Sequence, residues 1–377
     1  MSTPLLFVLF LPATLVAQNL IVVDGLNRPG TQFTDLPAAE AAAQDGDTLL
    51  LRGGSVYRAV HTSKAITIAG DERVFPLPID TSERALRVSG LPSGKRFVLC
   101  GVNFTGHGLP TVQVEACAGE VVITGCQASQ GGPMFEVSGC TSVLIQGCSS
   151  VGGPTPTVVG RQSNLVLSDC GFGGGYAPPT PALDLRQCTA LISRCLLFGG
   201  SGNAQEPPAP ALFASNSQII LGAAGQPLAN AVAAGLPGLG TGAASAIVGQ
   251  DSTVRLDPEV RVTATNGAPL FQGVAVVTAR FPSLSAVEVA ANAFAFTHGS
   301  APGAIPVFLL GAPGRILSSP AFTGTLWLDP LQTVVQVGVP PVLAGPALPF
   351  GTALLAQVVS VSATSVELSN PVGLVTR

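Results

Sequence analysis

The chain has few charged residues and few aromatic residues. Among its 377 residues only 10% are Asp, Glu, Lys or Arg, only 5% are Phe, Trp or Tyr, and the net charge at pH 7 is −4. A chain with so few charges and 47% apolar residues is neither typical of disorder nor suited to nucleic-acid binding. Its 45 Gly and 32 Pro instead favour many short strands separated by tight turns.

Long hydrophobic runs are also missing beyond the N-terminus. No later stretch reaches the roughly 18 uninterrupted apolar residues of a spanning helix, so no transmembrane segment is expected. The N-terminus has an apolar run at residues 5–11, followed by Pro12 and a short segment that ends at Ala17. This pattern predicts a signal peptide over residues 1–17 and a secreted protein, with a buried N-terminal strand as the alternative.

Two short strand-like patterns recur along the middle of the chain. Copies of the first end at Cys117, Cys140, Ser163, Cys188, Ser217 and Ser252, which are 23, 23, 25, 29 and 35 residues apart. Copies of the second end at Cys126, Cys148, Cys170 and Cys195, which are 22, 22 and 25 residues apart, and Val102 holds the same position upstream. Two independent patterns with one period predict a solenoid whose coils have about 22 residues.

The residues within each copy indicate how a coil folds. Side chains alternate along a strand, so Val121 and Ile123 are expected to point into the core, and Val122 and Thr124 outward. The residue before each cysteine is often Gly or Asp, which tolerate the left-handed conformation of a sharp bend. These residues are Gly125, Gly139, Gly147 and Asp169.

Both ends of the repeat carry distinct signals. Residues 35–45 form the strong helix pattern of the chain, with Asp35 as N-cap, and a helix there would cover the open end of the first coil. After residue 277 the repeat stops, and strand-like runs alternate with Pro and Gly turns, which favours a small C-terminal β-sandwich over residues 278–377. The chain is therefore expected to be all-β, with a parallel β-helix domain over residues 19–277 ahead of that sandwich.

The first coils carry a resemblance to a known group of proteins. The D-G-D-T-L-L-L-R-G-G-S-V-Y-R segment at 45–58, the K-A-I-T-I-A-G segment at 64–70 and the V-x-I-x-x-C coils resemble right-handed parallel β-helix proteins of the pectate-lyase-like class. This resemblance covers residues 19–275 and implies the fold. It leaves function open, because the class includes lyases, hydrolases, adhesins and proteins without known activity. The ending LLAQVV…VELSNPVGLV resembles a C-terminal module of secreted bacterial repeat proteins.

The eight cysteines allow two interpretations. Cysteines stacked on neighbouring coils lie about 4.8 Å apart, within the range for a disulfide. The pairs predicted on this basis are Cys117–Cys140, Cys126–Cys148 and Cys170–Cys195. The alternative is a ladder of reduced, buried thiols that act as small apolar side chains, which the serines at equivalent positions favour. A metal site is not expected, because no histidine lies near these cysteines.

The three histidines offer little chemistry. They are His61, His107 and His298. His107 lies in a G-H-G segment similar to a motif of polygalacturonase-like glycosidases, but the Asn-Thr-Asp and paired-Asp motifs that should precede it are absent. Without two carboxylates to flank a glycosidic bond, a glycosidase lacks both its acid and its base.

Charged residues gather at outward positions of the first strand pattern. Glu136, Arg161, Asp184 and Arg186 are expected on one face, with Arg161 and Arg186 on adjacent coils. A lyase would use Arg186 as the base, with Asp184 and Glu136 binding Ca²⁺. The alternative is a solvated ladder of charges that keeps an apolar solenoid soluble.

These observations favour a secreted, non-catalytic β-helix protein with a binding or scaffolding role at the cell surface or in the extracellular space. Its expected partners are extracellular polysaccharides or cell-surface components and not nucleic acid, and no cofactor is expected. The alternative is a polysaccharide lyase acting on uronate-containing polymers, which would need Ca²⁺. A third hypothesis is self-association through an open coil end or through the C-terminal sandwich.

Overall fold

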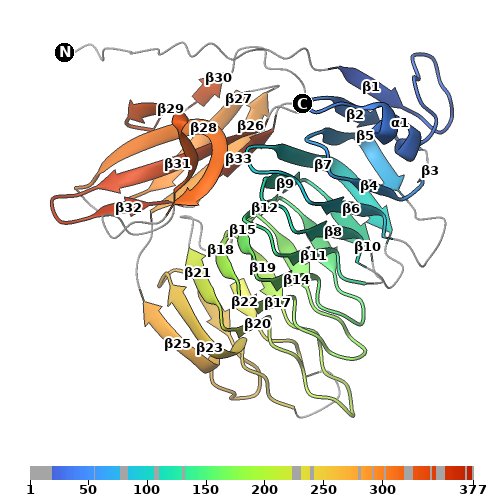
Figure 1. Cartoon of the computed structure of the whole chain (residues 1–377). Helices are drawn as coiled ribbons and strands as arrows, with labels where there is room; N and C mark the ends of the chain where they lie inside the picture. Colours follow the sequence, from blue (N-terminus) through green and yellow to red (C-terminus); the bar gives the residue numbers. More distant parts are fainter. Residues whose placement is uncertain are drawn as a thin grey trace.

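The computed structural model describes residues 19–54, 56–76, 84–105, 110–129, 132–222, 231–237, 242–278, 282–290, 293–300, 303–317, 326–339, 342–344, 353–369 and 372–375. The predicted signal peptide and His107 lie outside these ranges. The chain is an all-β protein in which a parallel β-solenoid is followed by a separate antiparallel unit (Figure 1). No helix in the described ranges has the length and hydropathy needed to cross a membrane.

Each full coil of the solenoid contributes strands to three columns, and every strand pairs in parallel with the coils before and after it. The first column consists of β4 (Val60–Thr62), β6 (Leu86–Ser89), β8 (Val112–Glu115), β11 (Phe135–Ser138), β14 (Val158–Arg161), β17 (Leu183–Arg186), β20 (Leu212–Ser215) and the beginning of β23 (Ile247–Leu256) and of β25 (Phe271–Thr278). The second consists of β1 (Leu20–Val23), β2 (Thr48–Leu51), β5 (Thr67–Pro76), β7 (Arg96–Thr105), β9 (Glu120–Thr124), β12 (Ser142–Gln146), β15 (Asn164–Ser168), β18 (Thr189–Ser193), β21 (Gln218–Gly222) and the remainder of β23 and β25. The third consists of β3 (Val56–Tyr57), β10 (Gln127–Ser129), β13 (Ser149–Val151), β16 (Gly171–Gly173), β19 (Leu196–Phe198), β22 (Ala231–Ala233) and β24 (Arg261–Thr263), with the ends of β5 and β7.

The register of these strands confirms both sequence repeats. Val121 stands beside Val143 in the second column, and Phe135 stands beside Val112 in the first, as the alignment of the copies predicts. Arg96 pairs with Glu120, which places Val102 in the cysteine position. The third column was not predicted, because strands such as Gly171–Gly173 are too short to show an alternating pattern.

A continuous apolar core runs along the inside of the coils. Val121 and Ile123 are fully buried in it, as predicted, and so are the equivalent residues of neighbouring coils. The predicted bends are present as well, because Gly125, Gly147 and Asp169 all have positive φ angles. Alternating strands and left-handed bends therefore generate the coil, and stacking buries its inner side chains.

The N-terminal end of the solenoid is closed by the chain itself. Helix α1 (Leu36–Ala42) buries Leu36 and Ala39 against the first coil, as the capping helix should. Asp35 occupies the N-cap position, as predicted, but its side chain pairs with Arg58 and makes no capping hydrogen bond. Phe33 bridges to Val23 and covers the free edge of β1.

The C-terminal unit is formed by two antiparallel sheets. One contains β26 (Ser283–Ala290), β27 (Ala293–Gly299) and β30 (Val342–Ala344), and the other contains β28 (Ile305–Leu317), β29 (Leu326–Val337), β31 (Ala353–Val361), β32 (Val366–Leu368) and β33 (Val372–Val375). Phe296 of the first sheet meets Phe308 of the second edge-to-face, with ring centroids 5.0 Å apart. The two sheets share a core of their own, which is the arrangement of a small sandwich.

This C-terminal unit packs on the outside of the solenoid. Val122, Leu144 and Val166 point outward from the second column, yet all three are buried. They form one apolar cluster with side chains of the C-terminal sheets, including Leu309 and Leu355. Figure 1 shows that unit beside β7, β9 and β12. Val122 thus points outward as predicted, but it faces the C-terminal unit and not water.

Candidate ligand-binding cleft

An open cleft of about 490 Å³ lies on the outer side of the first column, where the loops before β17 and β20 meet the two strands. Prolines dominate its lining, together with one aromatic ring and three charged groups. The lining residues are Pro156, Pro178, Pro179, Pro181, Asp184, Arg186, Glu206, Pro207, Pro208, Ala209, Pro210 and Phe213.

The walls of the cleft come from two related loops. The segments A-P-P-T-P-A at 177–182 and E-P-P-A-P-A at 206–211 each lead into a strand of the first column. Leu183 pairs with Leu212, so the two segments lie at equivalent positions of successive coils. Because each proline ring fixes its own φ angle, these walls have little conformational freedom to lose when a ligand binds.

Glycines beneath the walls let the loops stack backbone against backbone. Gly200 donates to the carbonyl of Thr180 at 2.9 Å, and Ala209 donates to the carbonyl of Gly200 at 2.9 Å. A Cβ atom on Gly200 would lie 1.8 Å from the carbonyl oxygen of Gly175, so no larger residue fits without a backbone shift. The cleft is consequently preorganised by the fold.

An ion pair forms the polar part of the cleft. Arg186 donates from Nε to Oδ1 of Asp184 at 3.0 Å and from Nη2 to Oδ2 at 2.9 Å. Its guanidinium carbon lies 5.7 Å from the centroid of the Phe213 ring, within range of a cation–π interaction. The side chain of Asp184 is only 13% exposed, whereas that of Arg186 is 53% exposed. Phe213 stands beside Asp184 in the register of the two strands, and this position explains the three-way contact.

This pairing disfavours the roles that a lyase would give these residues, with Arg186 as the base and Asp184 as a Ca²⁺ ligand. The hydrogen bonds to Asp184 raise the pKa of Arg186, whereas a general base needs a lowered pKa. Both oxygens of Asp184 already accept from Arg186, so binding a cation would require that pair to separate. Within the described residues, no group of three or more His, Cys, Asp or Glu side chains could hold a metal ion.

The other predicted site residues lie outside the cleft. Arg161 stands beside Arg186 on the preceding coil, as predicted, and it is exposed. Glu136 stands beside Val159 one coil further away, and it accepts from Nε2 of Gln113 at 3.4 Å. The structure therefore joins Asp184 and Arg186, keeps Arg161 beside them and leaves Glu136 apart.

Sequence reasoning missed Phe213, Glu206 and the proline walls. The signal that could have found them is the Pro-Pro-x-Pro pattern at residues 178–181, which recurs 29 residues later, matching the spacing from Cys188 to Ser217. A loop motif that repeats with the coil must stack on itself in a solenoid.

The histidines of the described chain lie elsewhere. Nε2 of His61 lies 2.7 Å from Oγ of Ser89 in the first coils, and Nδ1 of His298 lies 3.4 Å from Oγ of Ser300 in the C-terminal unit. Neither contributes to the cleft.

Seven of the eight cysteines occupy turn positions in the coils, whereas Cys100 lies within β7 and joins the apolar cluster beneath the C-terminal unit. All eight are free, buried thiols in this structure. Most have a sulfur that donates to the carbonyl two residues earlier, for example from Cys170 to Ser168 at 3.2 Å, and Ser163 makes the same contact with its hydroxyl. Burial raises the pKa of the Cys170 thiol well above its usual range, which disfavours nucleophilic chemistry. The three disulfides remain a prediction that mass measurement with and without reduction would test.

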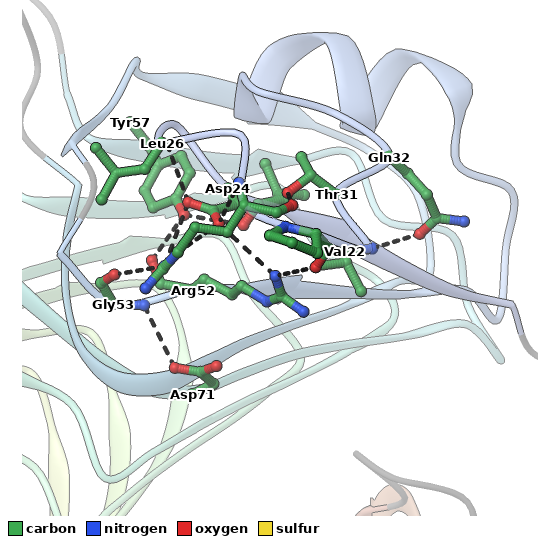
Figure 2. Close-up of polar contacts among 12 residues, drawn as sticks. Val22, Asp24, Leu26, Thr31, Gln32, Arg52, Gly53, Tyr57 and Asp71 are labelled. Carbon is green, nitrogen blue, oxygen red and sulfur yellow. Dashed lines mark hydrogen bonds and ion pairs between the residues drawn. The ribbon is translucent and has the colours of Figure 1, made fainter.

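A second polar cluster closes the N-terminal end. Figure 2 shows the buried carboxylate of Asp24 near Arg52 and Tyr57. Asp24 accepts from Nε of Arg28 at 2.7 Å, and the Tyr57 hydroxyl donates to the carbonyls of Val23 at 2.9 Å and Arg52 at 2.8 Å. These bonds tie the loop after β1 to the next coil, which is a structural role.

Comparisons with known proteins address only the fold. No protein-family model and no curated protein matches the sequence. ORF18 of Geobacillus virus E2 is similar over 89% of this chain and 69% of its own, with 10% identity and a TM-score of 0.34. The enzymatically active domain of tailspike protein 2 from bacteriophage CBA120 is similar over 87% of this chain and 72% of its own, with 11% identity and a TM-score of 0.30. Similarity at this level carries no argument about function.

Proposed function

We propose that this protein is a secreted, non-catalytic β-helix protein that binds an extracellular polysaccharide of low charge in the proline-walled cleft. The observation that carries the proposal is the combination of rigid apolar walls with an ion pair already satisfied within the cleft. Such a site can recognise a ligand by shape and hydrogen bonding, and its one carboxylate outside the Asp184–Arg186 pair is that of Glu206, whereas cleavage of a glycosidic bond by hydrolysis needs two carboxylates that flank it.

The chemistry of the lining suits a sugar. Proline rings and the Phe213 ring offer apolar surface for the C–H faces of a pyranose. Arg186 uses two of its N–H groups on Asp184 and has further donors on an exposed side chain. Glu206 at the rim adds an acceptor for hydroxyl groups. A ligand with alternating C–H and O–H groups matches this arrangement.

The charges favour a neutral polymer over a uronate. Asp184 and Glu206 are acidic and Arg186 is the basic group of the lining, so the cleft has no excess positive charge. A polyanion would face repulsion from the two carboxylates, and the protein as a whole carries a net charge of −4. The polysaccharide is therefore expected to bind with little dependence on salt.

A binding panel tests this proposal. Neutral and uronate-containing polysaccharides are titrated into the purified protein by isothermal calorimetry. We expect a neutral polymer to bind and Phe213→Ala to weaken it about 10-fold, because one aromatic contact is worth roughly 1–1.5 kcal/mol. Phe198→Ala is the matched control, because Phe198 is a 47% exposed phenylalanine on the third column. Binding that is lost equally in both variants, or that occurs only with uronates, would contradict the proposal.

The rival function, a Ca²⁺-dependent polysaccharide lyase, has its own assay. The protein is incubated with uronate polymers and Ca²⁺ while absorbance at 235 nm follows any unsaturated product. We expect no product. Product that disappears in Arg186→Ala would establish the lyase instead.

A further inference from the structure

The two ends of the solenoid differ in what covers the terminal strand. At the N-terminal end, Gln32 and Phe33 donate to the carbonyl of Val22, and α1 covers the core. At the other end β25 pairs with β23, and no further strand of the described residues pairs with its free edge. The described strands of the C-terminal unit pack against the side wall around Val122 and Leu144, and they leave Val276 37% and Val277 50% exposed on β25.

The inner row of side chains is also uncovered in β25. Val276 continues the column of Val254, but Val254 is 0% exposed and Val276 is 37% exposed. Phe271 continues the column of the buried Ile247 and is only partly buried. The apolar core that earlier coils share with the next coil thus ends on side chains that are only partly buried.

The strand carries neither of the residue types that most often protect an edge, charged residues and proline, although its pairing with β23 is interrupted by a register shift opposite Gly273. Its sequence, FQGVAVVT, contains no charged residue and no proline. Natural edge strands commonly carry lysine, proline or an inward charge that prevents pairing with another chain. An uncharged strand rich in valine is a good pairing partner for a copy of itself, because antiparallel pairing brings no like charges together.

We propose that two copies of this chain associate through their β25 ends in a closed, two-fold dimer. The partner is a second copy joined by the same end, because the N-terminal edge of every copy is already covered by its own Phe33 and helix α1. A head-to-tail stack would need that edge free. The contact is therefore isologous and stops at two chains.

In this dimer the β25 strands pair antiparallel and the two inner rows meet. Phe271, Val274 and Val276 of each copy cover those of the other and replace the missing next coil. The cleft between β17 and β20 lies on the side wall and stays accessible in both copies. Two clefts in one particle would raise the avidity for a repetitive polymer without any new contact.

The oligomeric state of the full chain tests this inference. Sedimentation velocity between about 1 and 100 µM covers the dissociation constants of ordinary dimers. We expect a species of twice the chain mass that Val276→Lys converts to monomer. Ala275→Lys should do the same from an outward position of the edge strand, and far-UV circular dichroism checks that both variants are folded.

Val335→Lys is the matched control, because Val335 is a 61% exposed valine on β29, a strand of the C-terminal unit. We expect this variant to remain dimeric. A monomer over the whole concentration range, growth into larger polymers, or a dimer that is lost in Val335→Lys but kept in Val276→Lys would each overturn the proposal.

Discussion

The same coils present two outward faces that meet different surroundings. On the second column Val122, Leu144 and Val166 point outward and lie beneath the C-terminal unit. On the first column Asp184 and Arg186 point outward at a solvent-exposed cleft. Both sets obey the same alternation of side chains along a strand. Alternation along the strand therefore fixes whether a side chain points outward. Whether the outward side chains are then covered or exposed depends on whether the stacked residues of that column are apolar or charged.

A charge placed on the covered face should lower the unfolding free energy more than any other substitution proposed here. Leu144 is 3% exposed between the solenoid and the C-terminal unit. Leu144→Asp would bury an unpaired carboxylate there, and we expect a loss of about 3–5 kcal/mol in unfolding free energy, or release of the C-terminal unit. Urea unfolding measures the first outcome and limited proteolysis the second.

Ser138→Asp supplies the control on the other outward face. Ser138 belongs to β11 of the same coil and is partly exposed. Its substitution should change the unfolding free energy by less than about 0.5 kcal/mol. Equal effects of the two substitutions would mean that the C-terminal unit does not cover the second column in solution.

The structure of each coil could be predicted from the sequence, but the packing of the C-terminal unit against the coils was not predicted. The cysteine and serine positions, the inward valines and the left-handed bends follow from local patterns, and the register bears them out. The apolar outward residues at 122, 144 and 166 were also visible. A strand that is apolar on both sides is typical of one buried on both sides, so the covered face could have been inferred.

The cleft was harder to predict because it depends on residues 29 positions apart. Asp184 and Arg186 were recognised as an outward pair, and their spacing of two residues on one strand places them on one side. The partner ring of Phe213 comes from the next coil, and the proline walls come from loops. Their contacts depend on how the loops stack, which no single strand pattern contains.

Two Asp–Arg pairs, one beside each outward face, extend the comparison to the effect of pH. Asp169 and Arg194 pair at turns that follow strands of the covered face, where both side chains are more than three-quarters buried. Burial raises the pKa of Asp169 despite the attraction of Arg194. The folded state therefore binds this proton more readily than the unfolded chain does, so the wild type gains stability as pH falls through the raised pKa.

Asp169→Asn isolates that effect, because asparagine tolerates the left-handed backbone at this position. The unfolding free energy of the wild type minus that of the variant should increase as pH falls from 7 towards 4. Urea unfolding at several pH values measures the difference. A change of the opposite sign would mean that pairing with Arg194 outweighs burial.

The exposed pair should matter least for stability. The Arg186 side chain is 53% exposed, and exposed ion pairs contribute about 0–1 kcal/mol. We expect Arg186→Ala to change the unfolding free energy by less than about 1 kcal/mol, whereas Arg194→Ala, which strands a largely buried Asp169, should cost more. Urea unfolding of both variants at physiological salt compares them directly. If Arg186→Ala lowered the unfolding free energy as much as Arg194→Ala, the Asp184–Arg186 pair would stabilise the fold. Substitutions in the cleft would then change the stability of the coil as well as the binding site.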